Sequence, residues 1–197
     1  MRTTRGQTGG MSAVIGLLLA AGSGERFGGP KALAETDGVA WVVSSVRVLR
    51  EGGCEPVVVV VGSSAAEVAG LLDPQVVVVE AADWATGMGA SLRAGLAAVA
   101  ELDADAVLVH LVDLPDVGAA VVRRVTSAAS PSVLARADYG GEPGHPVLIG
   151  RDHWDGVAAS AGADRGARAY LAQHEVTLVA CSDLADGQDV DLPPTYA

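Results

Sequence analysis

Short, continuous runs of valine and leucine recur along the chain and predict buried β-strands. Within each run the apolar residues are not interrupted by the alternating polar positions of a half-exposed strand. Continuous runs are typical of a parallel sheet with helices on both faces, because both sides of every strand are then covered. The predicted strands span residues 14–21, 56–62, 76–79, 106–112, 146–150 and 176–180.

Segments with helical spacing separate these strands, at 39–50, 65–72, 90–102, 118–128 and 165–174. The alternation predicts an α/β fold with a doubly wound, mostly parallel sheet in a three-layer α/β/α sandwich. Ligands of such folds bind beyond the carboxyl ends of the strands. The segment 137–145 is rich in Gly and Pro, so we interpret it as a hairpin or flap over the site, with a plain connecting loop as the alternative.

Length and composition fit one globular domain. The 197 residues are 50% hydrophobic and 19% charged, which excludes wholesale disorder. We expect a single domain over 11–197 after a flexible leader at 1–10, with Met11 as an alternative start. The apolar run at 13–21 is much shorter than the roughly 20 residues that cross a bilayer, so we interpret it as a strand and not as a signal peptide.

The net charge of −11 argues against nucleic acid or an anionic membrane surface as a partner. Cys54 and Cys181 lack metal-ligand spacing, and we interpret both as reduced thiols of a cytoplasmic protein. The four histidines are too scattered in the sequence to indicate a metal cluster.

A glycine-rich segment after the first strand predicts an anion-binding loop. Glycines let backbone N–H groups turn inward and approach an anion closely. Arg26 and Lys31 lie in or beside this loop, and Lys31 is the only lysine among thirteen basic residues. A compact ammonium at this point suits a phosphate. The alternative is a glycine-rich turn with two solvated cations. The loop glycines are Gly22, Gly24, Gly28 and Gly29.

Two familiar nucleotide motifs fit this loop poorly. The third glycine of a dinucleotide fingerprint comes one residue late, and no acidic residue ends the second strand. The GxxxxGK[ST] pattern of P-loop proteins does not occur in the sequence.

Carboxylates near strand ends indicate a magnesium site. Asp113 follows the strand 106–112, where it could hold Mg²⁺ together with substrate phosphates. A helix N-cap is the alternative for Asp113 or Asp116. Asp189 and Asp191 would share one face of an extended segment, so either could complete the site, unless this end is only an acidic solvated tail. We interpret His110, inside the strand, as a packed core residue.

A third segment opens a helix with Gly87 and Gly89 and places Ser91 near its first turn. The free N–H groups of a helix start could face a base edge or a ribose, although a Gly-rich helix start with a Ser is usually only a cap.

Taken together, these segments resemble the MobA-like NTP transferases, and within them the molybdenum cofactor cytidylyltransferase branch. The resemblance extends from about residue 13 to 192. It rests on LAAGSGERFGGPKAL, WATGMGASLRAGL, LVDLP, GHPVLIGR, DRGAR and DVDLP, which occur in the family's order. It implies a fold like that of the nucleotide-diphospho-sugar transferases.

The resemblance also implies roles for individual residues. Catalysis would fall to Arg26, Lys31 and Asp113, and Mg²⁺ would be held by Asp113 and Asp191. The nucleotide would be bound by Ala20, Ala21, Gly22, Ser23, Gly24, Arg26, Lys31, Gly87, Gly89 and Ser91. Because residues 19–22 read Leu-Ala-Ala-Gly, as in the cytidylyl branch, CTP is expected in preference to GTP.

By this resemblance the protein transfers CMP to the phosphate of molybdopterin, releases pyrophosphate and passes the cofactor to a molybdoenzyme. The segments AETDGVAWV and LPPT depart from the family's usual pattern on the acceptor side. Two alternatives therefore stay open: another phosphorylated acceptor, such as a sugar 1-phosphate or a phospholactate, and a non-catalytic chaperone that binds the cofactor.

Overall fold

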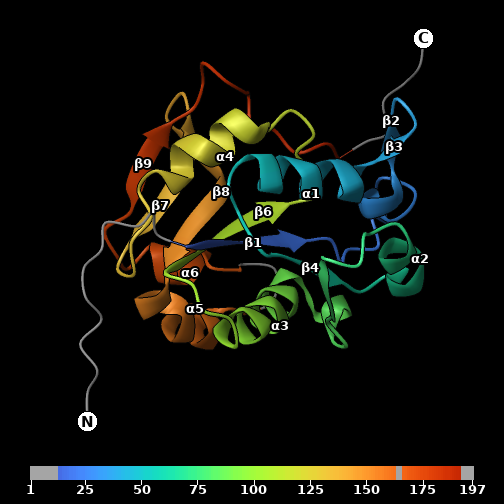
Figure 1. Ribbon diagram of the computed structural model, residues 1–197, viewed down its shortest axis with the longest axis horizontal. Coiled ribbons are helices and arrows are strands. Elements are labelled where there is room, and N and C mark those ends of the chain that lie inside the picture. Colours follow the sequence, from blue (N-terminus) through green and yellow to red (C-terminus); the bar gives the residue numbers. More distant parts are fainter. Residues whose placement is uncertain (1–12, 163–165, 192–197) are drawn as a thin grey trace.

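A seven-stranded sheet forms the centre of the protein (Figure 1). The computed structural model describes residues 13–162 and 166–191. The predicted leader at 1–10 and the first residue of the predicted helix 165–174 lie outside these ranges. In sheet order the strands are β5 (Val77–Glu80), β4 (Val57–Val61), β1 (Val14–Leu19), β6 (Ala106–Leu111), β8 (Glu142–Gly150), β7 (Leu134–Tyr139) and β9 (Thr177–Ala180).

The sheet is mostly parallel, as the alternation of strands and helices predicts. Strand β1 pairs in parallel with β4 and β6, β4 with β5, and β7 with β9. Strand β8 is antiparallel to both of its neighbours, β6 and β7, and the tight turn at Gly140 and Gly141 returns the chain directly from β7. The hairpin predicted at 137–145 is therefore confirmed. A separate two-stranded ribbon pairs β2 (Glu35–Thr36) with β3 (Val39–Ala40).

Helices cover both faces of the sheet and give the three predicted layers (Figure 1). Helices α1 (Trp41–Glu51), α2 (Ala65–Gly70) and α4 (Ala119–Thr126) contribute side chains to one apolar cluster. Helices α3 (Met88–Ala100), α5 (Trp154–Ser160) and α6 (Arg168–Leu171) contribute to the cluster on the opposite face. Three short 3₁₀ turns, η1 (Lys31–Leu33), η2 (Trp84–Thr86) and η3 (Arg151–His153), connect these elements.

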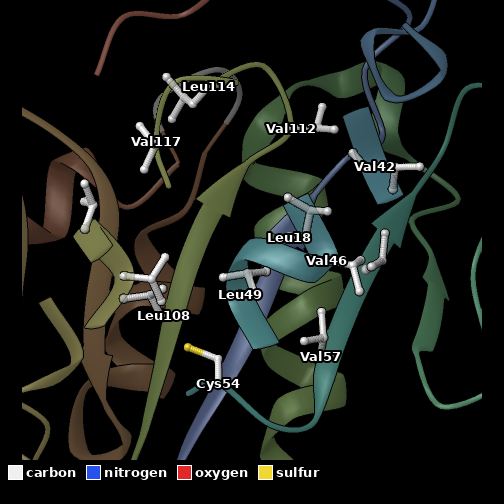
Figure 2. Close-up of a cluster of buried hydrophobic side chains, with 14 of the residues drawn as sticks. Leu18, Val42, Val46, Leu49, Cys54, Val57, Leu108, Val112, Leu114 and Val117 are labelled. Atoms are coloured by element: carbon white, nitrogen blue, oxygen red, sulfur yellow. The ribbon is translucent and has the colours of Figure 1, made fainter. Parts of the chain in front are cut away.

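Strand β1 divides its side chains between the two clusters. Val14 and Leu18 join the first cluster, whereas Ile15 and Leu17 join the second, because successive residues of a strand point to opposite faces. Figure 2 shows Leu18 of β1 and Val57 of β4 beside Val46 and Leu49 of α1. Both faces of β1 are therefore buried, which explains its unbroken apolar sequence.

The two edge strands differ from this pattern. Val78 of β5 is 39% exposed and Leu178 of β9 is 52% exposed, so the prediction of full burial from an apolar run is wrong at both edges. An edge strand has a neighbour on one side only, and the helices cover the middle of the sheet better than its margins. None of the helices in the described ranges is long and apolar enough to cross a membrane.

Candidate active site

A cavity of about 500 Å³ opens where β1 and β6 end side by side. Leu19, the last residue of β1, lies between Val60 of β4 and Leu111 of β6. The chain leaves β1 through Ala21 and leaves β6 through Val112 and Asp113, and both exits line the cavity. Because the three strands are parallel, their carboxyl ends converge here, where an α/β sheet binds its ligands.

The glycine loop folds back on itself at the rim of this cavity. The N–H groups of Gly28 and Gly29 both donate to the carbonyl of Gly24, at 2.9 and 3.1 Å. Gly24 has φ of 61°, and a Cβ there would lie 1.9 Å from the carbonyl oxygen of Gly29. Only glycine fits this point of the turn. Gly22, Ser23 and Gly24 line the cavity, as does Arg26, whose side chain is exposed.

Lys31 projects its ammonium from η1 onto two carboxylates. Its Nζ lies 2.9 Å from Oδ2 of Asp113 and 3.2 Å from Oδ1 of Asp191. Burial by itself would lower the pKa of Lys31, but the hydrogen bonds and charges of Asp113 and Asp191 outweigh it and raise the pKa. The side chain is 15% exposed, so the only lysine of the sequence is a fixed positive charge at the cavity wall.

Asp191 reaches the cavity because the end of the described chain is fastened to the loop after β6. The N–H of Val190 donates to the carbonyl of Asp113 at 3.0 Å. The N–H groups of Asp186 and Gly187 donate to Oδ2 of Asp116, at 2.9 and 3.0 Å. The carboxylate of Asp116 thus holds this segment and does not cap α4, which begins after Gly118.

The start of α3 forms the opposite wall. Gly87 precedes the helix with φ of 119°, a conformation that side chains other than glycine rarely adopt. Gly87 and Ser91 line the cavity, and Ser91 is otherwise buried. Gly89 and Ala20, by contrast, lie off the cavity wall: Gly89 is buried within α3, and Ala20 packs in the cluster beneath α1.

Two aromatic residues that were not predicted from the sequence also line the cavity. Phe27, the only phenylalanine of the sequence, stands beside the loop with its ring 5.4 Å from that of Trp41. Trp84 of η2 lines the same cavity. In a chain with 4% aromatic residues, their positions next to the glycine-rich segments are the signal that could have found them.

The pair of carboxylates fits a magnesium or manganese ion. Asp113 and Asp191 share one ammonium partner, so their oxygens converge on one point at the strand ends. One or two carboxylates, completed by water and substrate phosphates, are the ligand set that Mg²⁺ uses in nucleotide enzymes. Within the described ranges, no group of three or more His, Cys, Asp or Glu residues could hold a metal without substrate.

Both cysteines and His110 lie outside the cavity. Cys54 and Cys181 are free and buried, and burial raises the pKa of Cys54 to about 12. His110 is 1% exposed inside β6, which confirms the prediction of a packed core histidine.

An α/β sheet with a glycine-rich loop, a fixed ammonium and two carboxylates at its strand ends defines a class of nucleotide-binding protein. The sequence matches the MobA-like NTP transferase domain over residues 16–178. The chain therefore belongs to the MobA-like NTP transferase family, as its motifs predict.

The chain is also similar to two proteins whose names indicate different activities. Over 193 residues the chain is 37% identical to nicotine blue oxidoreductase from Paenarthrobacter nicotinovorans, which covers 92% of this chain and 93% of that protein. Over 112 residues it is 39% identical to the bifunctional IPC transferase and DIPP synthase from Rubrobacter xylanophilus. The second match covers 53% of this chain and 26% of that protein.

Solved structures share the fold. Rv0371c from Mycobacterium tuberculosis is 26% identical with a TM-score of 0.75, over 93% of this chain and 94% of that one. It has also been solved in complex with manganese, with a TM-score of 0.69 over 86% of this chain and 88% of that one at 25% identity. A nucleotidyl transferase from Methanothermobacter gives a TM-score of 0.78 at 22% identity, over 91% and 92% of the two chains. The fold is that of the nucleotide-diphospho-sugar transferases.

Proposed function

We propose that this protein is a Mg²⁺-dependent nucleotidyltransferase that transfers CMP from CTP to a phosphorylated acceptor, the phosphate of molybdopterin. The observation that carries the proposal is the meeting of Lys31, Asp113 and Asp191 opposite the glycine loop in one cavity. A partly buried ammonium, paired carboxylates and inward-turned amides are the groups that a nucleoside triphosphate with its metal requires. We expect the reaction in the cytoplasm, with a molybdoenzyme as recipient of the product.

In the reaction, a phosphate oxygen of the acceptor attacks the α-phosphorus of the nucleotide. A bond forms between that oxygen and phosphorus, the bond from the α-phosphorus to the bridging oxygen breaks, and pyrophosphate leaves with the electron pair. The attacking phosphate is already ionised near neutral pH, so the protein needs to supply no nucleophile. Catalysis then consists of positioning and charge neutralisation.

Each group of the site has a task in this scheme. The loop from Gly22 to Gly24 offers backbone amides to the triphosphate, and Arg26 and Lys31 neutralise its charge. Asp113 and Asp191 would hold Mg²⁺, which supplies Lewis-acid stabilisation of the phosphate oxygens. For Lys31 to reach a phosphate, its ammonium must exchange part of its contact with these carboxylates for the ligand.

The nucleotide base would lie between the end of β1 and the start of α3. Ala21 and Ser91 line the cavity there, and Trp84 offers a ring on which a base can stack. The Cβ of Ala21 would narrow this space against a purine, which supports CTP over GTP.

Measurement of pyrophosphate release tests the proposal. The protein is incubated with each of the four NTPs and Mg²⁺, with and without molybdopterin and its molybdenum-loaded form. We expect release only when CTP and a molybdopterin acceptor are both present. Release with a sugar 1-phosphate or 2-phospholactate instead would identify another acceptor. Tight binding of nucleotide and cofactor without any release would identify a chaperone.

A second candidate function is oxidoreductase activity. It is favoured by one observation, the 37% identity to nicotine blue oxidoreductase over nearly the full length of both chains. The same cavity would then bind a redox co-substrate that contains a nucleotide. Absorbance at the nicotinamide band, followed with a reduced nicotinamide dinucleotide and a quinoid dye, separates the two functions: a transferase oxidises no dinucleotide.

A further inference from the structure

A second cavity, of about 320 Å³, adjoins the first and is lined by a different set of side chains. Met88 and Leu111 line both cavities and mark where they meet. The walls of the second cavity come from the β7–β8 hairpin, from α6 and from the segment that carries Asp191. Its ionisable side chains are Arg136, His145, Arg168 and Asp189.

Arg136 is held in a fixed orientation in this cavity. Its Nε donates to the carbonyl of Gly144 at 3.2 Å, and its Nη2 donates to the carbonyl of Pro143 at 2.8 Å. Both acceptors belong to β8, so the hairpin clamps a guanidinium that is half-buried. The two carbonyls orient the group without neutralising its charge.

The two arginines of this cavity lack a salt-bridge partner among the described residues, and Asp189 is the one carboxylate that lines the cavity with them. The protein as a whole nevertheless carries a net charge of −11. Burial and the nearby charge of Arg168 both lower the pKa of Arg136. Burial, followed by the charges of Arg136 and Arg168, outweighs the opposing charge of Asp189 and lowers the pKa of His145 to about 4, so this histidine is neutral at pH 7.

The half-buried guanidinium of Arg136 is disfavoured by burial and by the charge of Arg168 beside it, and an anionic ligand would offset both effects. The sequence has 24 acidic residues available for pairing, yet only Asp189 lines this cavity. Where arginines are left unpaired in this way, an anionic ligand with a planar oxygen pair is the partner they fit best.

We propose that the second cavity holds the acceptor, and that Arg136 and Arg168 bind a second anionic group of that acceptor, distinct from the phosphate that reacts. This inference rests on the proposed function. It favours acceptors that carry a carboxylate, a further phosphate or another anion besides the reacting phosphate. It disfavours sugar phosphates in which the reacting phosphate is the only charged group.

The position of the arginines supports a second anion over the reacting phosphate. The attacking oxygen must reach the α-phosphorus beside Lys31 and Asp113, in the first cavity, and neither arginine lines that cavity. An acceptor that enters past Met88 and Leu111 would put its phosphate at the metal site and its far end at the arginines.

A matched pair of organic phosphates tests the inference by equilibrium binding. The probes are 3-phosphoglycerate and glycerol 3-phosphate, which differ by a carboxylate in place of a hydroxymethyl group. Each is titrated calorimetrically at fixed ionic strength, with and without a non-hydrolysable CTP analogue and Mg²⁺. We expect 3-phosphoglycerate to bind about tenfold more tightly, the scale of one charge-assisted contact.

Arginine variants then locate the contact. Arg168→Gln, at an exposed side chain, should remove most of the tenfold preference and leave the affinity for glycerol 3-phosphate within about twofold. Arg136→Gln should do the same, provided that its melting temperature is unchanged. The control is Arg47→Gln, an exposed position on α1, which should leave both affinities unaltered.

Three results would overturn the inference: equal affinity for the two probes, equal losses for both probes in Arg168→Gln, or the same loss in Arg47→Gln. Failure of the proposed function would be detected in different measurements. The CTP analogue would not bind, or no pyrophosphate would be released. The titrations without nucleotide still decide the anion site in that case.

Discussion

The single lysine is the residue on which the proposed chemistry depends most. Lys31→Ala removes a partly buried positive charge that already lies within hydrogen-bond distance of two carboxylates. We expect kcat/KM for nucleotide transfer to fall by roughly 10²- to 10³-fold, or about 3 to 4 kcal/mol of transition-state stabilisation, the scale for one preorganised electrostatic contact. Steady-state pyrophosphate release measures this loss.

The variant Lys31→Arg tests whether the site requires a compact ammonium or only a positive charge. A planar guanidinium cannot place one point charge between Asp113 and Asp191, so we expect less than a tenth of the wild-type rate. Full activity in this variant would show that any cation suffices at this position and that a lysine is not required.

Asp113 is expected to be indispensable for metal-dependent turnover. Asp113→Asn keeps the shape of the side chain but replaces an anionic ligand by a neutral one, and magnesium favours charged oxygens. We predict a loss of at least 100-fold in kcat, with an unchanged melting temperature. Asp152→Asn, at an exposed position in η3, is the control. Activity within threefold of wild type at saturating Mg²⁺ would rule out Asp113 as a ligand.

Ala21 is predicted to contribute to the choice of base. Its side chain is buried at the end of β1 and lines the first cavity. Removing one methyl group from a pocket changes discrimination by about 1 to 3 kcal/mol, or roughly 10- to 200-fold. Ala21→Gly should therefore raise kcat/KM for GTP relative to CTP. Equal use of the two nucleotides by the unmodified protein would assign the base preference to other residues.

At the scale of residues, sequence patterns could predict Lys31 and Asp113 because each stands at a marked position: the only lysine, and a carboxylate directly after an apolar strand. The choice between Asp189 and Asp191 depends on the bond from Val190 to Asp113. No local pattern encodes that long-range bond, which turns Asp191 to the first cavity and Asp189 to the second.

At the scale of elements, the close contact between α3 and the sheet depends on Gly95. A Cβ at this position would lie 2.6 Å from Cδ1 of Leu17 and 3.0 Å from Cγ2 of Val60. Gly95→Ala should lower the free energy of unfolding by about 1 to 3 kcal/mol through overpacking, although alanine is the better helix former. Chemical denaturation followed by circular dichroism measures the change.

Gly70→Ala is the matched control, because Gly70 ends α2 and a Cβ there meets nothing within 4 Å. This variant should be neutral or slightly stabilising. A neutral result for Gly95→Ala as well would mean that α3 can shift away from β1 at little cost.

The pattern of apolar runs predicts the central strands well, because both of their faces are buried and every residue is then apolar. It misses β7, in which Arg136 and Asp138 interrupt the apolar residues, and it misses α5, which is only seven residues long. It also predicts too much burial for β5 and β9, because position in the sheet and not sequence decides which strands are edges.

At the scale of the whole molecule, buried histidines should make stability depend on pH. Burial, with a smaller contribution from the charge of His145, lowers the pKa of His110 to about 3, whereas an unfolded histidine titrates near 6.5. Between these values the unfolded chain binds more protons than the folded one. The free energy of unfolding is therefore fully retained above pH 6.5 and falls with decreasing pH, by up to about 1.4 kcal/mol per pH unit for this residue.

Urea unfolding at several pH values between 4 and 7 tests this prediction. His110→Gln should flatten the pH dependence, because the variant loses one group that titrates only in the unfolded chain. His174→Gln, at an exposed position, should leave the slope as it is. An identical slope in wild type and His110→Gln would assign the acid sensitivity to other groups.

The ion pair between Lys31 and Asp191 joins residues 160 positions apart, which makes the order of synthesis matter. When β1, β4 and β6 have been translated, the glycine loop and Asp113 are present in the nascent chain. The second carboxylate, Asp191, follows Asp113 by a further 78 residues. At roughly 5 to 20 residues per second, about 4 to 16 s of translation separate the two. Under the proposed function, nucleotide and metal would stabilise only a chain translated at least as far as Asp191, and shorter chains would gain none of this stabilisation.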